Sequence, residues 1–361
     1  MDLIELGKEI IKKIYSAGFC AYIVGGTVRD MLLSLEINDC DLTTNMPLSL
    51  LKEHFKVVEN GSEYESVTII YKGESFEITH FRSDVMYLDH RHPKVELVDD
   101  YYSDSKRRDF TINALAMDFD GKIIDYYDGL KDLSNKTIKT IGNPVDRFNE
   151  DALRILRGLY FASKLNFDIE ENTLKAIDSK KGLLNTLSEK RLYQYFIKIL
   201  YAKTDRGIRY INELDLFKYI PKFKKWLSLV DKTMKEEDLI YYYYLKEKDF
   251  PITVSKDKYK IANNIEELIN DNSNYSLYKN QDCYFKFKDI LKHLGCDIIG
   301  RDVKYQSLII KNDKELALSK EEIASYFLGK EKSIKIDLVI KAILDGKIKN
   351  EKEEIRKFIL K

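Results

Sequence analysis

The sequence predicts an α+β protein, in which a mixed α/β part at the N-terminus is followed by a part that is entirely helical. Up to about residue 125, short runs rich in β-branched and aromatic residues alternate with turns, which is typical of strands. From about Arg147 onward, apolar residues recur at helical spacing almost throughout. We therefore expect a domain boundary at this change of pattern, and 361 residues suffice for two or three domains.

The composition narrows the class of protein. The 60 basic residues balance the 60 acidic ones, so net charge alone does not indicate nucleic-acid binding, which would depend on how charge is distributed. The four cysteines form neither a CxxC pair nor a zinc spacing with histidine, which indicates reduced thiols in a cytoplasmic protein. Residues 1–19 predict an amphipathic helix and not a signal peptide, and no apolar run approaches membrane-spanning length, so we expect no membrane partner.

The first element of interest is the stretch IVGGTVRDMLLSLEINDCDLTT, which begins at Ile23. A short apolar strand, Ala21–Val24, precedes a glycine pair that allows the backbone to approach a ligand closely. The helix expected over 27–35 would present unpaired N–H groups to an anion, with Arg29 adding charge. Asp39 and Asp41 alternate on a second strand, so both carboxylates project from one face. Either feature alone is common, but together they favour a phosphate-rich ligand and a divalent cation.

The further strands are expected at 55–58, 67–71, 76–81, 114–119 and 123–126. Glu77 lies in the middle of one of them, and the strand alone leaves two interpretations open: a solvent-facing residue, or a third carboxylate beside Asp39 and Asp41. The polar stretch SDVMYLDHRHPKVELVDD lacks periodicity and is expected to be a mobile loop of the kind that closes over a site.

Two later stretches carry guanidinium groups. In SKRRDFTINALAMD, Arg107 and Arg108 can meet a phosphate or a base edge in bidentate fashion, and Asn113, one helical turn past Asp109, can serve ribose hydroxyls. The alternative is a solvated basic turn that Asp109 caps.

In NEDALRILRGLY, Asn149 is expected to cap a helix whose first turn holds Glu150 and Asp151. Asp151, Arg154 and Arg157 then share one face of that helix. The alternative is an ordinary surface ion pair, which would contribute little to stability.

Together these motifs resemble the class II tRNA nucleotidyltransferase and bacterial poly(A) polymerase family, over roughly the first 200 residues and in the expected order. GGTVRD with DCD resembles the catalytic motif, RRDFTINA the ribose-selecting motif, and DYYDG the hinge motif. EDALRILR resembles the base-recognition motif, and SEKRLYQYFIKIL the helix-turn motif that follows it. Beyond about residue 200 the resemblance is faint.

The resemblance implies a polymerase-β-like nucleotidyltransferase head with a mixed sheet over 1–146, a helical neck that recognises the base over 147–205, and a helical body and tail that bind tRNA over 206–361. It implies Mg²⁺ at Asp39 and Asp41 and makes Glu77 a third catalytic carboxylate. The nucleotide-binding residues that it implies are Gly26, Thr27, Arg29, Arg108, Asp109, Asn113, Asp151, Arg154 and Arg157.

The chemistry that follows is template-free RNA extension. Metal ions held by the two aspartates would activate the primer 3′-hydroxyl for in-line attack on the α-phosphate and neutralise the departing pyrophosphate. Cytosine and adenine each offer an exocyclic amine donor beside a ring-nitrogen acceptor, which a carboxylate from Asp151 and a guanidinium from Arg154 match. We therefore expect CTP, ATP and tRNA as partners, and no DNA.

The expected function is CCA tRNA nucleotidyl transfer. Alternatives are an A-adding or CC-adding enzyme, a poly(A) polymerase, or a catalytically inactive RNA- or nucleotide-binding relative, against which the intact Asp39 and Asp41 count. Three positions depart from the family. Tyr160 stands where a further arginine is common, and Lys190 and Tyr195 stand where glutamates are usual.

Overall fold

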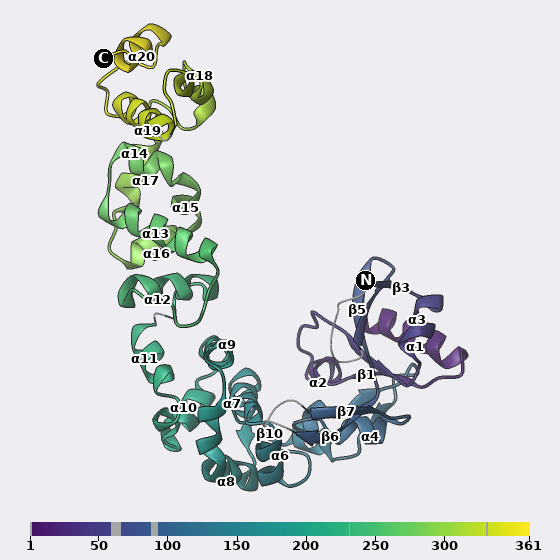
Figure 1. Ribbon diagram of the computed structural model, residues 1–361. Helices are drawn as coiled ribbons and strands as arrows, with labels where there is room; N and C mark the ends of the chain where they lie inside the picture. The colour runs from purple at the N-terminus through teal and green to yellow at the C-terminus, as the bar shows by residue number, and fades with distance from the viewer. Residues whose placement is uncertain (1, 59–65, 88–92, 231, 330) are drawn as a thin grey trace. The chain divides into compact units, whose positions relative to one another are not determined.

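The computed structural model describes residues 2–58, 66–87, 93–230, 232–329 and 331–361, without the side chains of 85–87, 93 and 94 (Figure 1). The chain divides into two compact units, Met1–Lys225 and Trp226–Lys361. The division of 1–146, 147–205 and 206–361 expected from the sequence is finer than this and stays a prediction. Among the described residues, none of the helices has both the length and the apolar character needed to cross a membrane.

The first unit is built on a seven-stranded sheet with the strand order β3-β4-β5-β2-β1-β8-β9. Strands β2 and β5 are parallel and every other pair of neighbours is antiparallel, so the mixed sheet expected from the sequence is confirmed. The strands in this order are Lys56–Val58, Ser66–Tyr71, Glu74–His80, Asp41–Thr44, Ala21–Val24, Ala116–Met117 and Ile123–Ile124.

Short helices flank this sheet. Helix α1 buries Ile10, Ile11 and Ile14 and contacts β1, because its apolar residues recur at helical spacing. The other helices around the sheet are short and connect its strands. The helical elements, in order, are α1 (Leu3–Ser16), α2 (Gly26–Leu32), α3 (Leu48–His54), α4 (Tyr101–Ser105), η1 (Thr111–Asn113) and α5 (Gly129–Ser134).

The stretch after residue 82 corrects one expectation. Instead of a loop without regular structure, β6 (Arg82–Tyr87) pairs with β7 (Pro93–Leu97) in an antiparallel ribbon. The sequence does not show the apolar–polar alternation typical of strands here, because a two-stranded ribbon need not bury a continuous apolar face. His90, Arg91 and His92 lie outside the described residues.

The helix boundary near residue 150 is a second correction. The cap is Asn143, whose Oδ1 accepts a hydrogen bond from the backbone N–H of Val145, and Pro144 occupies the first turn of α6 (Pro144–Glu150). A proline in that position and a preceding asparagine are a strong start signal. Asp151 therefore ends one helix, and α7 (Leu153–Leu165) begins after it.

The remainder of the first unit is helical, apart from a small parallel pair, β10 (Thr137–Ile138) and β11 (Asp168–Ile169). Helix α7 packs against α9 and α10, and several of its residues line a cavity together with Asp41 at the start of β2. The helices that complete this part are α8 (Glu171–Lys180), η2 (Lys181–Thr186), α9 (Glu189–Leu200), α10 (Arg206–Glu213), η3 (Leu216–Lys218) and α11 (Pro221–Leu229), the last of which runs into the second unit.

The described part of the second unit contains helices and no strand, as the apolar spacing predicts. One core cluster gathers the apolar residues Leu318, Ile323, Ile340, Ile343 and Ile355. Its helices are η4 (Glu236–Asp238), α12 (Leu239–Glu247), α13 (Lys256–Asn270), α14 (Asn274–Lys279), α15 (Gln281–Lys286), α16 (Lys288–His293), α17 (Ile298–Gln306), η5 (Asp313–Glu315), α18 (Lys320–Ser325), α19 (Glu331–Leu344) and α20 (Lys352–Ile359).

Gly129, at the end of DYYDG, lies so close to a neighbouring backbone that a larger residue at this position should destabilise the fold. A Cβ atom on this residue would lie 2.5 Å from the backbone oxygen of Thr111, which cannot move independently. We expect Gly129→Ala to lower the free energy of unfolding by about 1–3 kcal/mol, the usual cost of overpacking. Thermal or urea unfolding measures this. Gly182→Ala is the control, because its nearest atom, in the Tyr219 ring, lies 3.9 Å away; equal losses in both variants would contradict the prediction.

Candidate active site

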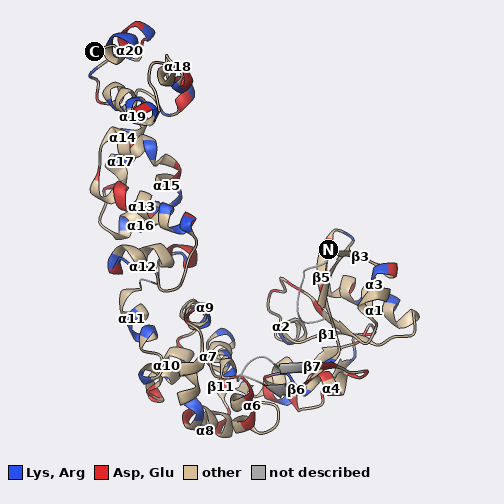
Figure 2. Ribbon diagram, in the orientation of Figure 1, with Lys and Arg blue, Asp and Glu red and all other residues tan. Residues whose placement is uncertain are grey.

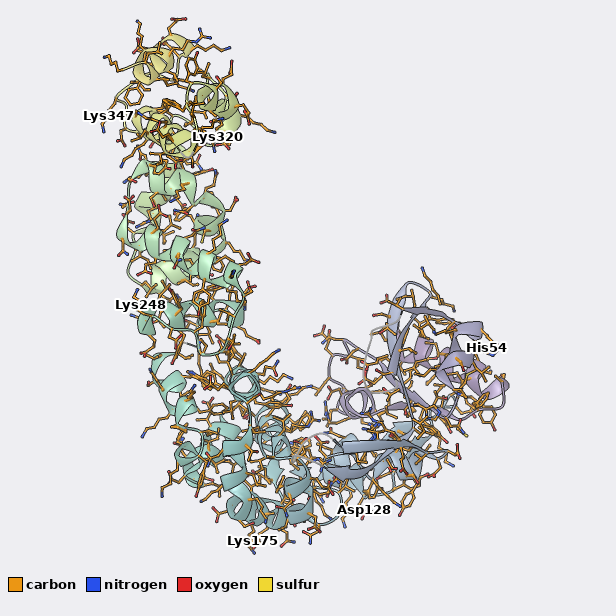
Figure 3. All side chains as sticks on the ribbon, viewed as in Figure 1. His54, Asp128, Lys175, Lys248, Lys320 and Lys347 are labelled. Atoms are coloured by element: carbon orange, nitrogen blue, oxygen red, sulfur yellow. The ribbon has the colours of Figure 1, made fainter. Side chains whose placement is uncertain are left out.

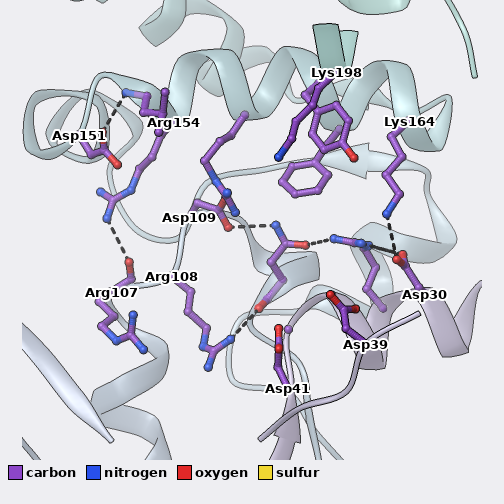
Figure 4. Close-up of a pocket in the computed structure, with 18 of the residues that line it drawn as sticks. Asp30, Asp39, Asp41, Arg107, Arg108, Asp109, Asp151, Arg154, Lys164 and Lys198 are labelled. Carbon is purple, nitrogen blue, oxygen red and sulfur yellow. Dashed lines mark hydrogen bonds and ion pairs between the residues drawn. The ribbon is translucent and has the colours of Figure 1, made fainter. Parts of the chain in front are cut away.

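A cavity of about 610 Å³ opens in the first unit where β1, α2 and β2 face η1 and the start of α7 (Figure 4). Its size is in the range of pockets that bind small ligands. The structure brings most of the site residues expected from the sequence to its walls, from segments more than a hundred residues apart. They are Gly26, Arg29, Asp39, Asp41, Arg108, Asp109, Asn113, Asp151, Arg154 and Arg157.

Two expected residues do not line this cavity. Glu77 lines a smaller neighbouring cavity of about 230 Å³ that Asp41 and Arg108 also line. Thr27 is buried beneath the Asp39–Asp41 segment: its hydroxyl donates to the backbone oxygen of Asp39 at 3.4 Å and accepts from the N–H of Asp41 at 3.2 Å. The structure thus gives Thr27 contacts with the aspartate segment itself, not with the cavity.

The glycine pair forms the turn between β1 and α2. Gly25 has a positive φ of 67°, which a residue with a side chain rarely adopts, and its N–H donates to the backbone oxygen of Leu115 at 3.1 Å. A Cβ atom there would lie 3.0 Å from Nη1 of Arg108. Glycine is therefore required both for the turn and for the close approach of the arginine.

The two aspartates lie where β2 begins. Asp39 precedes the strand and Asp41 is its first residue, while Cys40 and Leu42 are buried on the opposite side, as the alternation predicts. Burial and the charges of Asp39 and Glu77 raise the pKa of Asp41 to about 6, although the charge of Arg108 acts in the other direction. The aspartate ion is thus destabilised by its neighbours, and a cation beside it would relieve that repulsion.

Glu77 stands beside Asp41 because β2 and β5 are parallel and these two residues are paired in register. It is exposed, so both interpretations left open by its strand hold in part: it faces solvent, and it adjoins the aspartate. Among the residues that the structure describes, no group of three or more His, Cys, Asp or Glu side chains could together hold a metal ion. Any ion at Asp39 and Asp41 would therefore need oxygens from water or substrate.

Arg107 and Arg108 are held by one carboxylate. Asp104 is fully buried; its Oδ1 accepts from Arg107 at 2.9 and 3.0 Å, and its Oδ2 accepts from Nη2 of Arg108 at 3.1 Å. Burial opposes ionisation, but the two arginine charges keep the pKa of Asp104 below its ordinary value. This arrangement excludes the alternative of a freely solvated basic turn.

A chain of hydrogen bonds joins α2 to α7 through Asp109. Nη1 of Arg29 donates to Oδ1 of Asn113 at 2.5 Å, and Nδ2 of Asn113 donates to Asp109 at 3.0 Å. Nε of Arg157 donates to the other oxygen of Asp109 at 2.5 Å. Burial raises the pKa of Asp109, but Arg157 and these hydrogen bonds bring it below its ordinary value. Asn113, expected to contact ribose, thus also fixes the orientation of Arg29.

Arg154 and Asp151 are both held in place at the entry to α7. Arg154 is only 5% exposed; its Nη1 donates to Glu150 at 2.5 Å and to the backbone oxygen of Arg147 at 2.9 Å. Oδ1 of Asp151 accepts from the N–H of Leu153 at 2.9 Å. The alternative of an exposed surface pair is therefore wrong, and the carboxylate that pairs with Arg154 is Glu150, a partner that the sequence reasoning missed.

Sequence reasoning also missed several cavity residues. Lys164 could have been found, since it follows Arg157 by seven residues and so shares its helix face. Lys198 could not, because only the packing of α9 against α7 brings it to the cavity. The lining residues that the sequence reasoning missed are Asp30, Arg82, Asp84, Leu153, Phe161, Lys164 and Lys198, whereas Gly25, Arg107 and Tyr160 belong to the motifs singled out from the sequence.

The hydroxyl of Thr27 predicts a measurable coupling between stability and activity. Thr27→Val removes both hydrogen bonds to the Asp39–Asp41 segment, so we expect a loss of about 1 kcal/mol in the free energy of unfolding. We also expect a lower turnover, because the carboxylates lose their support. Thr27→Ser keeps the oxygen and is the control. Full turnover in the valine variant would contradict this positioning role.

Comparison with known proteins gives consistent matches. Residues 21–139 match the family described as poly A polymerase head domain, and residues 166–227 match the probable RNA and SrmB-binding site of polymerase A. The chain is 36% identical to the CCA-adding enzyme of Ligilactobacillus salivarius, over 98% of this chain and 95% of the relative.

Solved structures agree. The CCA-adding enzyme of Bacillus stearothermophilus in complex with CTP has a TM-score of 0.72 and 25% identity, and the match covers 100% of this chain and 97% of that one. The Thermotoga maritima CCA-adding enzyme complexed with tRNA_CCA has a TM-score of 0.54 and 21% identity, over 98% of this chain and 93% of that one, and supports the fold alone.

Proposed function

Since this chain belongs to the family of CCA-adding enzymes, we propose that it is a tRNA nucleotidyltransferase that adds C, C and A to the 3′ end of tRNA from CTP and ATP. It does so without a nucleic-acid template. The observation that carries the proposal is the single cavity that holds Asp39 and Asp41 on one wall and Asp151 and Arg154 on another. Reaction and base choice can therefore act on one bound nucleotide.

The reaction joins the 3′-oxygen of the RNA to the α-phosphorus of the nucleotide and breaks the bond from that phosphorus to the bridging oxygen, so pyrophosphate leaves. Asp39, Asp41 and Glu77 are the catalytic carboxylates. Gly26 and Arg29 hold the triphosphate, with Thr27 supporting the aspartate segment beneath it, and Arg108 lies beside Asp41 (Figure 4). Asp109 and Asn113 orient Arg29 and Arg157 and border the ribose.

The donor set suits a divalent cation, and we propose Mg²⁺. Burial and the neighbouring carboxylates raise the pKa of Asp41, and carboxylates are hard oxygen ligands. Mg²⁺ commonly binds one or two of them and completes its shell with water and substrate phosphates. Asp39 and Asp41 would hold the ions. When bound, they supply Lewis-acid stabilisation of phosphoryl charge and lower the pKa of the attacking hydroxyl.

Base choice follows from two side chains whose positions are fixed. Asp151 accepts from the exocyclic amine of cytosine or adenine, and Arg154 donates to the adjacent ring nitrogen. Uracil and guanine present a carbonyl and an N–H at those places, so each would leave a carboxylate facing an acceptor. The contacts of Arg154 with Glu150 and two backbone oxygens support this role, because they hold the guanidinium in one orientation.

The helical second unit is proposed to bind the tRNA body. Lys and Arg are interspersed with Asp and Glu along its helices, so none of the helices that the structure describes there is uniformly basic (Figure 2). The lysines at its surface include Lys248, Lys320 and Lys347, each paired with a nearby carboxylate (Figure 3). Such exposed pairs contribute little to stability, so the lysines can exchange a carboxylate for an RNA phosphate at small cost.

A cytoplasmic location is proposed as well. All four cysteines are free thiols, and burial raises the pKa of both Cys40 and Cys283 to about 12, so these thiols stay protonated. Free thiols persist in a reducing compartment.

The deciding experiment supplies the protein and Mg²⁺ with tRNA transcripts that lack the whole CCA end, its last two nucleotides or only its last one, each with a single NTP. We expect C on the first two and A on the last. Addition of A but never C would indicate an A-adding enzyme, and addition of C but never A a CC-adding enzyme. Long oligo(A) tails on unrelated RNA would indicate a poly(A) polymerase, and binding without transfer an inactive relative.

A further inference from the structure

Lys198 is a cation of the cavity for which the described residues provide no acidic partner. It lies on α9, and its amine points into the cavity (Figure 4). Its nitrogen sits 5.3 Å from the ring centre of Tyr195 and 5.7 Å from that of Tyr160, and over the described parts of the chain it has no ion pair.

The neighbouring cations differ in this respect. Arg29 and Lys164 pair with Asp30, Arg107 and Arg108 with Asp104, Arg154 with Glu150, and Arg157 with Asp109. Contact with an aromatic face compensates an ammonium ion less than a carboxylate or phosphate does. Lys198 can thus accept an anionic group that the described residues of the protein do not supply.

The contacts of three aromatic residues locate this amine within the cavity. Phe161 lies 5.0 Å from the guanidinium carbon of Arg29 and 5.4 Å from that of Arg157. Tyr160, the next ring, contacts Lys198, and the Tyr195 hydroxyl accepts from Arg157 at 3.4 Å. Lys198 therefore shares the wall of the cavity that carries Arg29 and Arg157.

This wall has an excess of positive charge. Arg29, Arg157, Lys164 and Lys198 are four cations, against which stand the two carboxylates Asp30 and Asp109. The excess is therefore two positive charges beside the glycine turn. Tyr160 carries no charge, so the positive charge beside its ring comes from Lys198 on the adjacent helix α9.

We propose that Lys198 binds the γ-phosphate of the incoming nucleoside triphosphate. The inference rests on the proposed function, which sets the α-phosphate at Asp39 and Asp41 and the rest of the triphosphate along Arg29. The γ-phosphate is the most charged group of the nucleotide and the one farthest from the base. A lysine amine offers donors only, so it suits phosphate oxygens and cannot tell cytosine from uracil.

The test measures equilibrium binding of CTP and CDP by calorimetry, with Mg²⁺ present and RNA absent so that no transfer occurs. Lys198→Met removes the charge but keeps a long side chain against the tyrosines. We expect it to weaken CTP binding about tenfold while CDP binding changes less than about twofold, as for loss of one charge-assisted contact. Lys198→Arg should retain the preference for CTP.

Lys190→Ala is the matched control, since Lys190 lies on the same helix but not in the cavity wall. Unchanged CTP binding in Lys198→Met, or equal losses for CTP and CDP, would overturn the inference while the proposed function stands. A higher KM for tRNA with unchanged CTP binding would assign Lys198 to an RNA phosphate and equally overturn it. If the unaltered protein binds neither CTP nor ATP, the proposed function itself fails.

Discussion

Asp41→Ala should reduce nucleotide addition at least about a thousandfold on every tRNA primer, since losing several kcal/mol of charge stabilisation costs a factor of ten per 1.36 kcal/mol. Asp41 lies within the electrostatic influence of two further carboxylates, because Asp39 precedes it by two residues and Glu77 is its partner across β2 and β5. Alanine leaves too few ligands for a divalent cation. Single-turnover incorporation of labelled CTP and ATP measures the loss for C and A separately.

The same substitution should not unfold the protein. Burial, and after it the charges of Asp39 and Glu77, oppose ionisation of Asp41, which is why its pKa is raised to about 6. The native carboxylate is therefore less stable than an unfolded one near pH 7, and its removal should leave the melting temperature of the metal-free protein unchanged or higher. Asp41→Asn is the companion variant. Activity within tenfold of the unaltered enzyme, or a large fall in melting temperature, would contradict this account.

How much of this centre the sequence could predict depends on the range of the interactions. The glycine turn and the alternation about Cys40 are local, so a strand period of two and a positive φ at Gly25 are enough to anticipate them. The register of Asp41 with Glu77 is not local, because it depends on a parallel pairing between β2 and β5 that no single strand reveals. The family resemblance was needed to favour Glu77.

In the segment from Asn143 to Leu165, by contrast, even the local structure was predicted incorrectly. Two pairs of residues here are typical of a helix start. The prediction placed the start at Asn149 and Glu150, but the helix begins at Asn143 and Pro144, six residues earlier. Asp151 consequently lies between α6 and α7, and Arg154 reaches back to Glu150 and to two backbone oxygens. The positions of Lys164 and Lys198 in the cavity wall depend on how α7 packs. Residue spacing along α7 could have predicted Lys164, but not Lys198, which lies on another helix.

The position of Asp151 between two helices sets up the second prediction. Asp151→Ala should retain transfer but lower discrimination for CTP over UTP, and for ATP over GTP, by a factor of about 5 to 150, which corresponds to the 1–3 kcal/mol carried by one good base-edge pair. The ratio of kcat/KM values for each pair measures this, on primers lacking CCA and on primers lacking only A. Asp146→Ala is the control, because Asp146 lies in the first turn of α6 and outside the cavity wall.

The variant Asp151→Asn distinguishes the role of Asp151 in base recognition from its role in capping α7. Oδ1 of Asp151 also accepts from the N–H of Leu153, so alanine removes a cap worth about 1 kcal/mol as well as the carboxylate. Asp151→Asn keeps that acceptor but replaces the other oxygen with an amide donor, which suits the carbonyl of uracil or guanine. Stability should recover while selectivity stays low and UTP incorporation rises. If asparagine instead restores full CTP and ATP preference, Asp151 acts by shaping α7, and the choice of base must lie with Arg154 alone.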